Sequence, residues 1–272
     1  MARIQKITLQ TTHVDKHGEV FPLDVLQTMM KLANEAIIPM GVEHDPRIPP
    51  LGRMLHTAVE KLEDGEYALI GTAELFDGDI TNLSDTGDRV MVVRDVEGNS
   101  LELTYDRNFR GEEDQETMRQ LALVLKCAEQ PDEEIKKSIE PIAILTIAGK
   151  FALAGIAAGF FGEIGADAYR ELKKLLVKIF STPNPDGAER LFTFNMTIVE
   201  GTHSVNVEVI LANPTDTEIQ EFMDDGIKKL DQVLPAHFNS PRGFRRIVFD
   251  YDASGLRVKF GVLKNGVPVK LN

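Results

Sequence analysis

The sequence predicts an α+β protein built from three consecutive parts. Short apolar stretches separated by Gly, Asn and Asp turns recur over residues 1–110, which favours a β-rich, barrel-like domain. Residues 111–182 show helical spacing and a long stretch rich in glycine and alanine. Residues 188–272 have the order strand, strand, helix, strand, strand, which predicts a small ββαββ domain.

The composition is that of an acidic globular protein. The 272 residues are 43% hydrophobic and 27% charged, and the formal net charge is −13. This charge disfavours general nucleic-acid binding, because phosphates are bound through Lys and Arg. A local basic cluster remains at Arg242, Arg245 and Arg246. Residues 1–6 lack an apolar signal stretch, so we expect a cytoplasmic protein.

Within the first part, the pattern predicts one helix among strands. Apolar residues at helical spacing predict a helix over residues 23–36. Residues 59–76 predict a hairpin around the turn Glu63-Asp64-Gly65-Glu66. Two short strands over 89–94 and 100–106 are expected on either side of a turn at 96–99.

The segment Val42 to Met54 is the most informative for function. It contains H-D-P-R-I-P-P-L-G-R, in which His44 is followed by an acid and a proline-rich turn. Each proline fixes its own φ and biases the preceding residue towards an extended conformation. The sequence therefore predicts that the imidazole of His44 is held in a defined place.

This order of features resembles the N-terminal part of phage prohead (capsid-maturation) serine proteases. The similarity runs through a D-x-x-G turn at 15–18, a helix, the H-D-P-x-x-P-P-L-G-R stretch at 44–53, a strand and a hairpin. It covers roughly residues 10–108, and it implies the barrel-like fold that this family shares with herpesvirus assemblins. It leaves the rest of the chain unexplained.

The resemblance also implies a pair of catalytic residues. In the family, the histidine of the H-D stretch is the base and a serine at the head of a later strand is the nucleophile, commonly as S-x-G-F. His44 matches the base, and Ser100 begins the predicted strand 100–106, although Glu102 stands where glycine is expected. Ser84 is a poorer candidate because it lies in a turn. The group that would orient the base stays open between His56, Asp45 and Glu102.

Other reactive residues have simpler interpretations. The single cysteine, Cys127, excludes an internal disulfide and is expected to be a small buried apolar residue in the helix that begins near Glu112. His13 and His17 flank Asp15, a spacing found in some metal sites, but no further ligand follows. We therefore predict no metal and no cofactor.

The stretch from Pro141 to Gly162 has Lys150 as its single charge, and we predict a helix there. Two interpretations stay open. It is either a buried or oligomeric helix, with Gly155 and Gly159 at a crossing, or a membrane-active segment of sufficient length. In the first case we expect a homo-oligomer or a helical hairpin, with Lys150 reaching solvent or Glu163. Residues 166–180 predict an amphipathic helix whose basic face is either solvated or rests on anionic lipid.

Residues 181–187 contain two prolines and a glycine and predict a linker to the ββαββ domain. The helix of that domain opens with the capping box Thr215-Asp216-Thr217-Glu218 and is expected to end near Val233. No nucleophile, metal or phosphate motif occurs in this part.

Three functional hypotheses follow. The chain is a serine peptidase that acts on a protein substrate, with His44 and Ser100 as its catalytic residues. Alternatively, it is a catalytically silent protease-like module that recognises a protein partner, for example a phage component in antiviral defence. The third hypothesis is an effector that perturbs membranes through residues 141–162. Glu102 in the glycine position favours the second hypothesis over the first.

Overall fold

The computed structural model describes residues 2–14, 20–42, 45–76, 83–93, 101–106, 109, 112–127, 132–134, 142–182 and 187–271. The chain is a mixed α+β protein with 33% helix and 40% strand. It divides into two compact units. Unit 1 comprises residues 1–92 and 262–269, and unit 2 comprises residues 93–261 and 270–272. This division differs from the predicted boundaries near 110 and 182–188.

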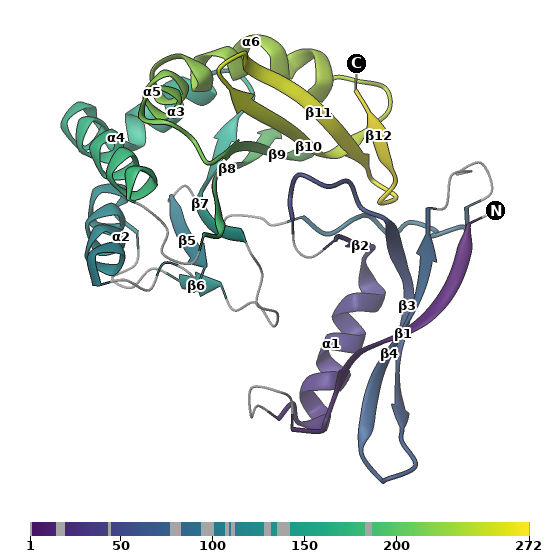
Figure 1. Ribbon diagram of the computed structural model, residues 1–272. Coiled ribbons are helices and arrows are strands. Elements are labelled where there is room, and N and C mark those ends of the chain that lie inside the picture. The colour runs from purple at the N-terminus through teal and green to yellow at the C-terminus, as the bar shows by residue number, and fades with distance from the viewer. Residues whose placement is uncertain are drawn as a thin grey trace. The chain divides into compact units, whose positions relative to one another are not determined.

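Unit 1 is a four-stranded sheet with one helix (Figure 1). Its elements are β1 (Arg3–Thr11), α1 (Leu23–Glu35), β2 (Ile38–Met40), β3 (Gly52–Lys61) and β4 (Tyr67–Leu75). The strand order is β1-β4-β3-β2, and all neighbours are antiparallel. Asn34 of α1 ties the helix to β3, because its side-chain amide bonds both the N–H and the C=O of Thr57. The predicted helix over 23–36 and the hairpin over 59–76 are confirmed.

Two other expectations for the N-terminal part are corrected. Among the described residues the sheet is open, with β1 and β2 at its edges, so the barrel-like closure is not formed. Met91 makes one isolated bridge to Ile37 where a strand over 89–94 was predicted. The strand predicted over 100–106 is β5 (Glu102–Asp106), and it belongs to unit 2.

Unit 2 is organised by a long mixed sheet. Its order is β12-β11-β10-β9-β8-β7-β5-β6, with residues 262–269 of β11 and β12 grouped with unit 1. Besides β5, its strands are β6 (Asp132–Glu134), β7 (Ile142–Ala152), β8 (Glu189–Glu200), β9 (His203–Ala212), β10 (Phe244–Asp252), β11 (Gly255–Leu263) and β12 (Pro268–Lys270). The β7–β8 and β9–β10 pairs are parallel, whereas β8–β9 is antiparallel.

The helices of unit 2 gather on one face of this sheet (Figure 1). They are α2 (Glu112–Leu125), α3 (Ile156–Ile164), α4 (Ala166–Ser181), α5 (Asp216–Glu221), the π-helical η1 (Phe222–Gly226) and α6 (Ile227–Phe238). One row of register partners across five strands illustrates the core beneath them. It consists of Leu103, Ile147, Phe194, Val209 and Phe249, each at most 3% exposed.

The helix predicted over 141–162 is wrong. Residues 142–152 form β7, a central strand between β5 and β8, and α3 begins only at Ile156. The strand is buried on both faces, so its sequence is continuously apolar and lacks the alternation that identifies a half-exposed strand. Gly155 supplies the left-handed turn before α3, with φ of 105°, and is not a helix-crossing residue. No helix in the described ranges is long and apolar enough to cross a membrane.

The predicted C-terminal helices are confirmed with small shifts, whereas residues 183–186 of the predicted linker lie outside the described residues. The amphipathic helix over 166–180 is α4, which buries its leucine and isoleucine side chains. Both hydrogen bonds of the capping box form between Thr215 and Glu218. The helical stretch continues through η1 and α6 to Phe238, beyond the expected end near Val233. The strand-strand-helix-strand-strand order over 188–272 is present, but its strands extend the sheet that also contains β7.

Candidate functional site

Both predicted catalytic residues, His44 and Ser100, lie outside the described residues. The described residues next to them belong to different compact units. Asp45 is part of unit 1, and Leu101 is part of unit 2.

The acid that follows His44 in the sequence is engaged by a neighbouring guanidinium. Arg47 Nε and Nη2 donate to the carboxylate of Asp45 at 2.9 and 2.8 Å, and the backbone N–H of Arg47 donates to the same group at 2.9 Å. These hydrogen bonds hold Asp45 and Arg47 together at the start of the proline-rich turn. The Asp45 side chain is only 9% exposed, so the pair is shielded from solvent.

The arginine that ends the motif is a structural residue of unit 1. Arg53 pairs with Glu74 on the neighbouring strand at 2.7 Å, and both side chains are 1% exposed. Arg53 also donates to the carbonyls of Ser84 and Asn265 at 2.6 and 2.7 Å. Burial alone would raise the pKa of Glu74, but hydrogen bonds from Ser84 and the charge of Arg53 outweigh it and lower that pKa. The network fixes two loops to the sheet.

The remaining candidates do not converge on one described site. His56 is exposed on β3, while Glu102 lies on β5 as the register partner of Ala148. The backbone of Ser84 is held by Arg53 and Glu74. The structure therefore does not select an orienting group for His44.

Cys127 and His13 make local contacts that do not point to a reactive site. Desolvation raises the pKa of the Cys127 thiol to about 11, and its sulfur donates to the carbonyl of Leu101 at 3.2 Å. The raised pKa lowers the thiolate fraction at neutral pH and makes this thiol a weak nucleophile. His13 Nε2 lies 2.7 Å from Asp64 on an exposed hairpin end, whereas Asp15 and His17 lie outside the described residues. The part of the chain that is described contains no group of three potential metal ligands.

Sequence inspection missed a polar layer in unit 2. The sheet face opposite the helices carries buried polar side chains, and we call it the polar sheet face. Its members are the buried residues Thr104, Thr146, Thr193, Asn195, Thr197, Asn206 and Glu208, together with the partly exposed Arg246. The signal was present as alternation, because polar residues occupy every second position from Thr193 to Thr197 between apolar neighbours.

Most of the polar sheet face is internally paired. Asn206 Nδ2 donates to Asn195 Oδ1 at 2.5 Å, and Arg246 holds Glu208 through two nitrogens at 3.0 and 2.5 Å. Thr193 differs, because its Oγ1 is buried and has no hydrogen-bond partner within the described part of the chain. The predicted cluster of Arg242, Arg245 and Arg246 is not a free basic patch, since Arg245 bonds Ser204 and Arg246 bonds Glu208.

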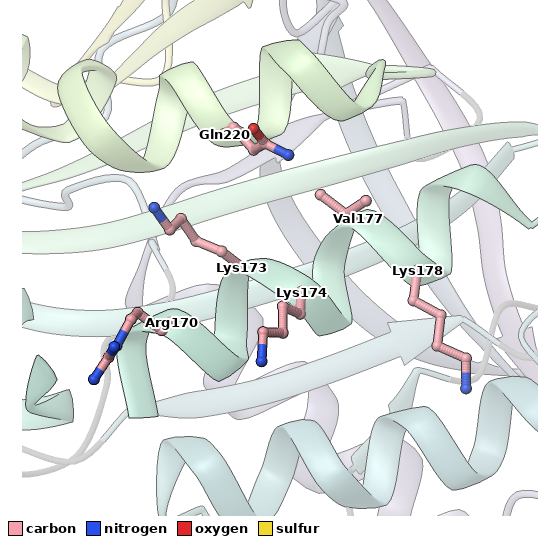
Figure 2. A pocket seen from close by; sticks show the side chains of 6 residues that line it. All are labelled: Arg170, Lys173, Lys174, Val177, Lys178 and Gln220. Carbon is pink, nitrogen blue, oxygen red and sulfur yellow. The ribbon is translucent and has the colours of Figure 1, made fainter. Parts of the chain in front are cut away.

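A second feature of unit 2 is a hollow of about 440 Å³ between α4 and α5, which we call the α4 groove (Figure 2). It is lined by Arg170, Lys173, Lys174, Val177, Lys178 and Gln220. Lys173 Nζ lies 2.7 Å from Asp224 and 5.1 Å from the ring centre of Tyr169. Burial, together with the charge of Asp224, raises the pKa of Tyr169, so its hydroxyl stays protonated.

A scan against protein-family models, a search of curated proteins and a search of solved structures each found no match.

Proposed function

We propose that this chain recognises another protein and that unit 1 supplies the contact surface. The observation that carries the proposal is the distribution of exposed apolar side chains. Of the 13 large hydrophobic residues that are exposed in the described ranges, 11 belong to unit 1. They are Ile4, Leu9, Val14, Val20, Val25, Met29, Leu32, Ile38, Leu51, Val90 and Val92. Concentrated exposed apolar surface is typical of protein–protein contact sites.

Helix α1 gives this surface a defined geometry. Leu26 and Ala33 are buried. Val25, Met29 and Leu32 follow the spacing i, i+4, i+7, and they remain 37%, 38% and 62% exposed. Residues at this spacing share one side of a helix. The helix thus has one apolar side inside unit 1 and a second one available to an apolar surface of a partner protein.

Two observations favour recognition over peptide-bond hydrolysis. Glu102 replaces the glycine expected after the family's serine. The charged residues of the histidine-containing motif, Asp45 and Arg53, are held in ion pairs. The resemblance to capsid-maturation proteases makes a phage structural protein the first partner to test, as expected for a role in antiviral defence.

Site-specific photocrosslinking tests this proposal in cells. A photoreactive phenylalanine analogue at Leu32 should give a crosslink to one defined protein, identified by mass spectrometry. Leu123 on α2 is a matched control, because it is also helical and is 78% exposed. Crosslinks that are absent at Leu32, or equal at both positions, would refute the assignment of unit 1.

Fluorophosphonate labelling separates recognition from hydrolysis. An activated serine reacts with this probe without any need for the natural substrate. We expect no labelled serine in the intact protein. Covalent labelling of Ser100 that disappears in a His44→Ala variant would instead establish a serine peptidase.

A further inference from the structure

We propose that the α4 groove binds an acidic, amphipathic segment of a partner protein. This goes beyond the contact surface of unit 1, because the groove belongs to unit 2 and uses no residue of α1. Figure 2 shows Lys173 and Val177 on the side of α4 nearest Gln220, with Arg170, Lys174 and Lys178 following one another along the helix.

The side chains that line the groove combine apolar parts with positively charged end groups. Val177 and the methylene stems of the lysines provide the apolar part, because long basic side chains bury their stems and keep the charge in water. Arg170, Lys174 and Lys178 recur every fourth residue, which spans about 12 Å at 1.5 Å per residue. A partner helix with carboxylates at the same spacing and an apolar side chain between them would match both parts.

The four cations already have acidic neighbours on this chain, and these pairs are exchangeable. Lys173 pairs with Asp224, and Lys178 pairs with Glu113 at 3.4 Å. Arg170 and Lys174 pair with acids one turn earlier on α4. Exposed ion pairs contribute little stability. Carboxylates of a partner can therefore replace them, and the chain's own acids act as competitors for the groove.

The chemistry favours a peptide over the two other common anionic partners. The net charge of −13 opposes every anionic partner, and it opposes highly charged polyanions such as nucleic acid or an anionic bilayer more strongly than a short acidic segment. The residues that line the groove include no aromatic ring on which a base could stack. A hollow between two helices also suits a protruding side chain better than a planar lipid surface.

The test measures binding of a defined probe to the full chain. The probe is a fluorescein-labelled helical peptide with glutamate at every fourth position and an adjacent leucine stripe, and its control carries glutamine in place of glutamate. We expect saturable binding of the glutamate peptide by fluorescence anisotropy and weakening with added salt. Lys174→Glu should reduce affinity about tenfold, because it replaces an attraction by a repulsion.

Two variants make the result specific. Arg119→Glu on α2 is the matched control, because Arg119 is also an exposed cation in a surface ion pair, but it does not line the groove. It should change affinity less than about twofold. Asp224→Asn should increase affinity, because it frees Lys173 from its competitor. Circular dichroism confirms that each variant is folded.

Four outcomes would overturn the proposal. They are the absence of saturable peptide binding, equal binding of the glutamine peptide, equal loss of affinity in Lys174→Glu and Arg119→Glu, and tighter binding to single-stranded DNA or phosphatidylserine vesicles than to the peptide. None of them depends on Leu32, so this test fails or succeeds independently of the surface on unit 1.

Discussion

The two units distribute polarity in opposite ways. Unit 1 carries 11 of the 13 large apolar side chains that are exposed in the described ranges, and it places an arginine–glutamate pair in its interior. Unit 2 buries its apolar residues under helices and covers the other face of its sheet with buried polar side chains. Exposed apolar surface stabilises nothing until a partner covers it, whereas buried polar groups must be paired within the fold. This difference supports the proposal that unit 1 provides a contact surface.

The largest expected effect is the loss of the ion pair in unit 1. Arg53→Met leaves the Glu74 carboxylate buried without its cation and deprives two carbonyls of a donor. Breaking one side of a buried pair typically costs about 3–5 kcal/mol. Hydrogen exchange followed by mass spectrometry should show faster exchange across β3 and β4 while β8 stays protected. Unchanged exchange would show that the pair does not hold unit 1 together.

The same pair gives unit 1 a specific pH dependence. Because the folded pKa of Glu74 lies below its ordinary value of 4.5, the ionised form is favoured by folding. This contribution is complete above the unfolded pKa, and it is lost as the pH falls through the lower, folded pKa. Unit 1 should lose protection on acidification below about pH 4, and this dependence should be weaker in Glu74→Gln.

The next effect concerns β7, the strand that is present where a helix was predicted. Ile147 is 0% exposed and lies on the helix-covered face of β7, whereas Thr146 belongs to the polar sheet face. Ile147→Ala should cost about 2–5 kcal/mol in the free energy of unfolding, measured by urea denaturation. Thr146→Val replaces the hydroxyl by a methyl group and should cost no more than one net hydrogen bond, about 0.5–1.5 kcal/mol. Equal small costs would mean that residues 142–152 are not a central strand.

That strand also shows where sequence information is insufficient. Helices such as α1 and α4 were predictable because one face is polar, so the period of 3.6 residues is visible. The stretch Ile142 to Ala152 is buried on both faces, and a continuously apolar run looks the same in a central strand and a buried helix. The pairing of β7 with β8 joins residues about 47 apart in sequence, which local patterns do not encode.

The candidate sites were predictable to different degrees. The amphipathic helix that lines the α4 groove was predicted, including its basic face. The contribution of Gln220 was not, because contacts between separate helices depend on tertiary packing. The polar sheet face was also missed, since a few alternating Thr and Asn residues have meaning only once the strands are in register.

A smaller effect concerns the helices of unit 2. Asp231 of α6 accepts from the backbone N–H groups of Ile156 and Ala157 at 2.8 and 3.4 Å, and it thereby caps α3 from another helix. Because a carboxylate at a helix N-terminus satisfies free donors, Asp231→Ala should cost about 1–2 kcal/mol. Asp225→Ala, which removes an exposed pair with Lys228, is the control and should cost less than about 0.5 kcal/mol. Urea denaturation measures both, and equal costs would argue against the cap.

The smallest expected effect on stability concerns one buried hydroxyl in each unit. Thr57 of unit 1 is 1% exposed, and its Oγ1 donates to the carbonyl of Met30 at 3.2 Å. Thr193 of unit 2 is 4% exposed, and its Oγ1 has no partner among the described residues. Replacing a paired hydroxyl by a methyl group leaves an acceptor unsatisfied, whereas replacing an unpaired one removes a desolvation penalty.

Threonine-to-valine substitutions should therefore have opposite signs in the two units. Thr57→Val should destabilise the protein by about 1–2 kcal/mol, and Thr193→Val should stabilise it by about 1 kcal/mol. Thermal unfolding followed by circular dichroism gives the sign directly, because both substitutions preserve side-chain shape. Destabilisation by Thr193→Val would mean that its hydroxyl is hydrogen-bonded in solution, which would place a bound water or ligand on the polar sheet face.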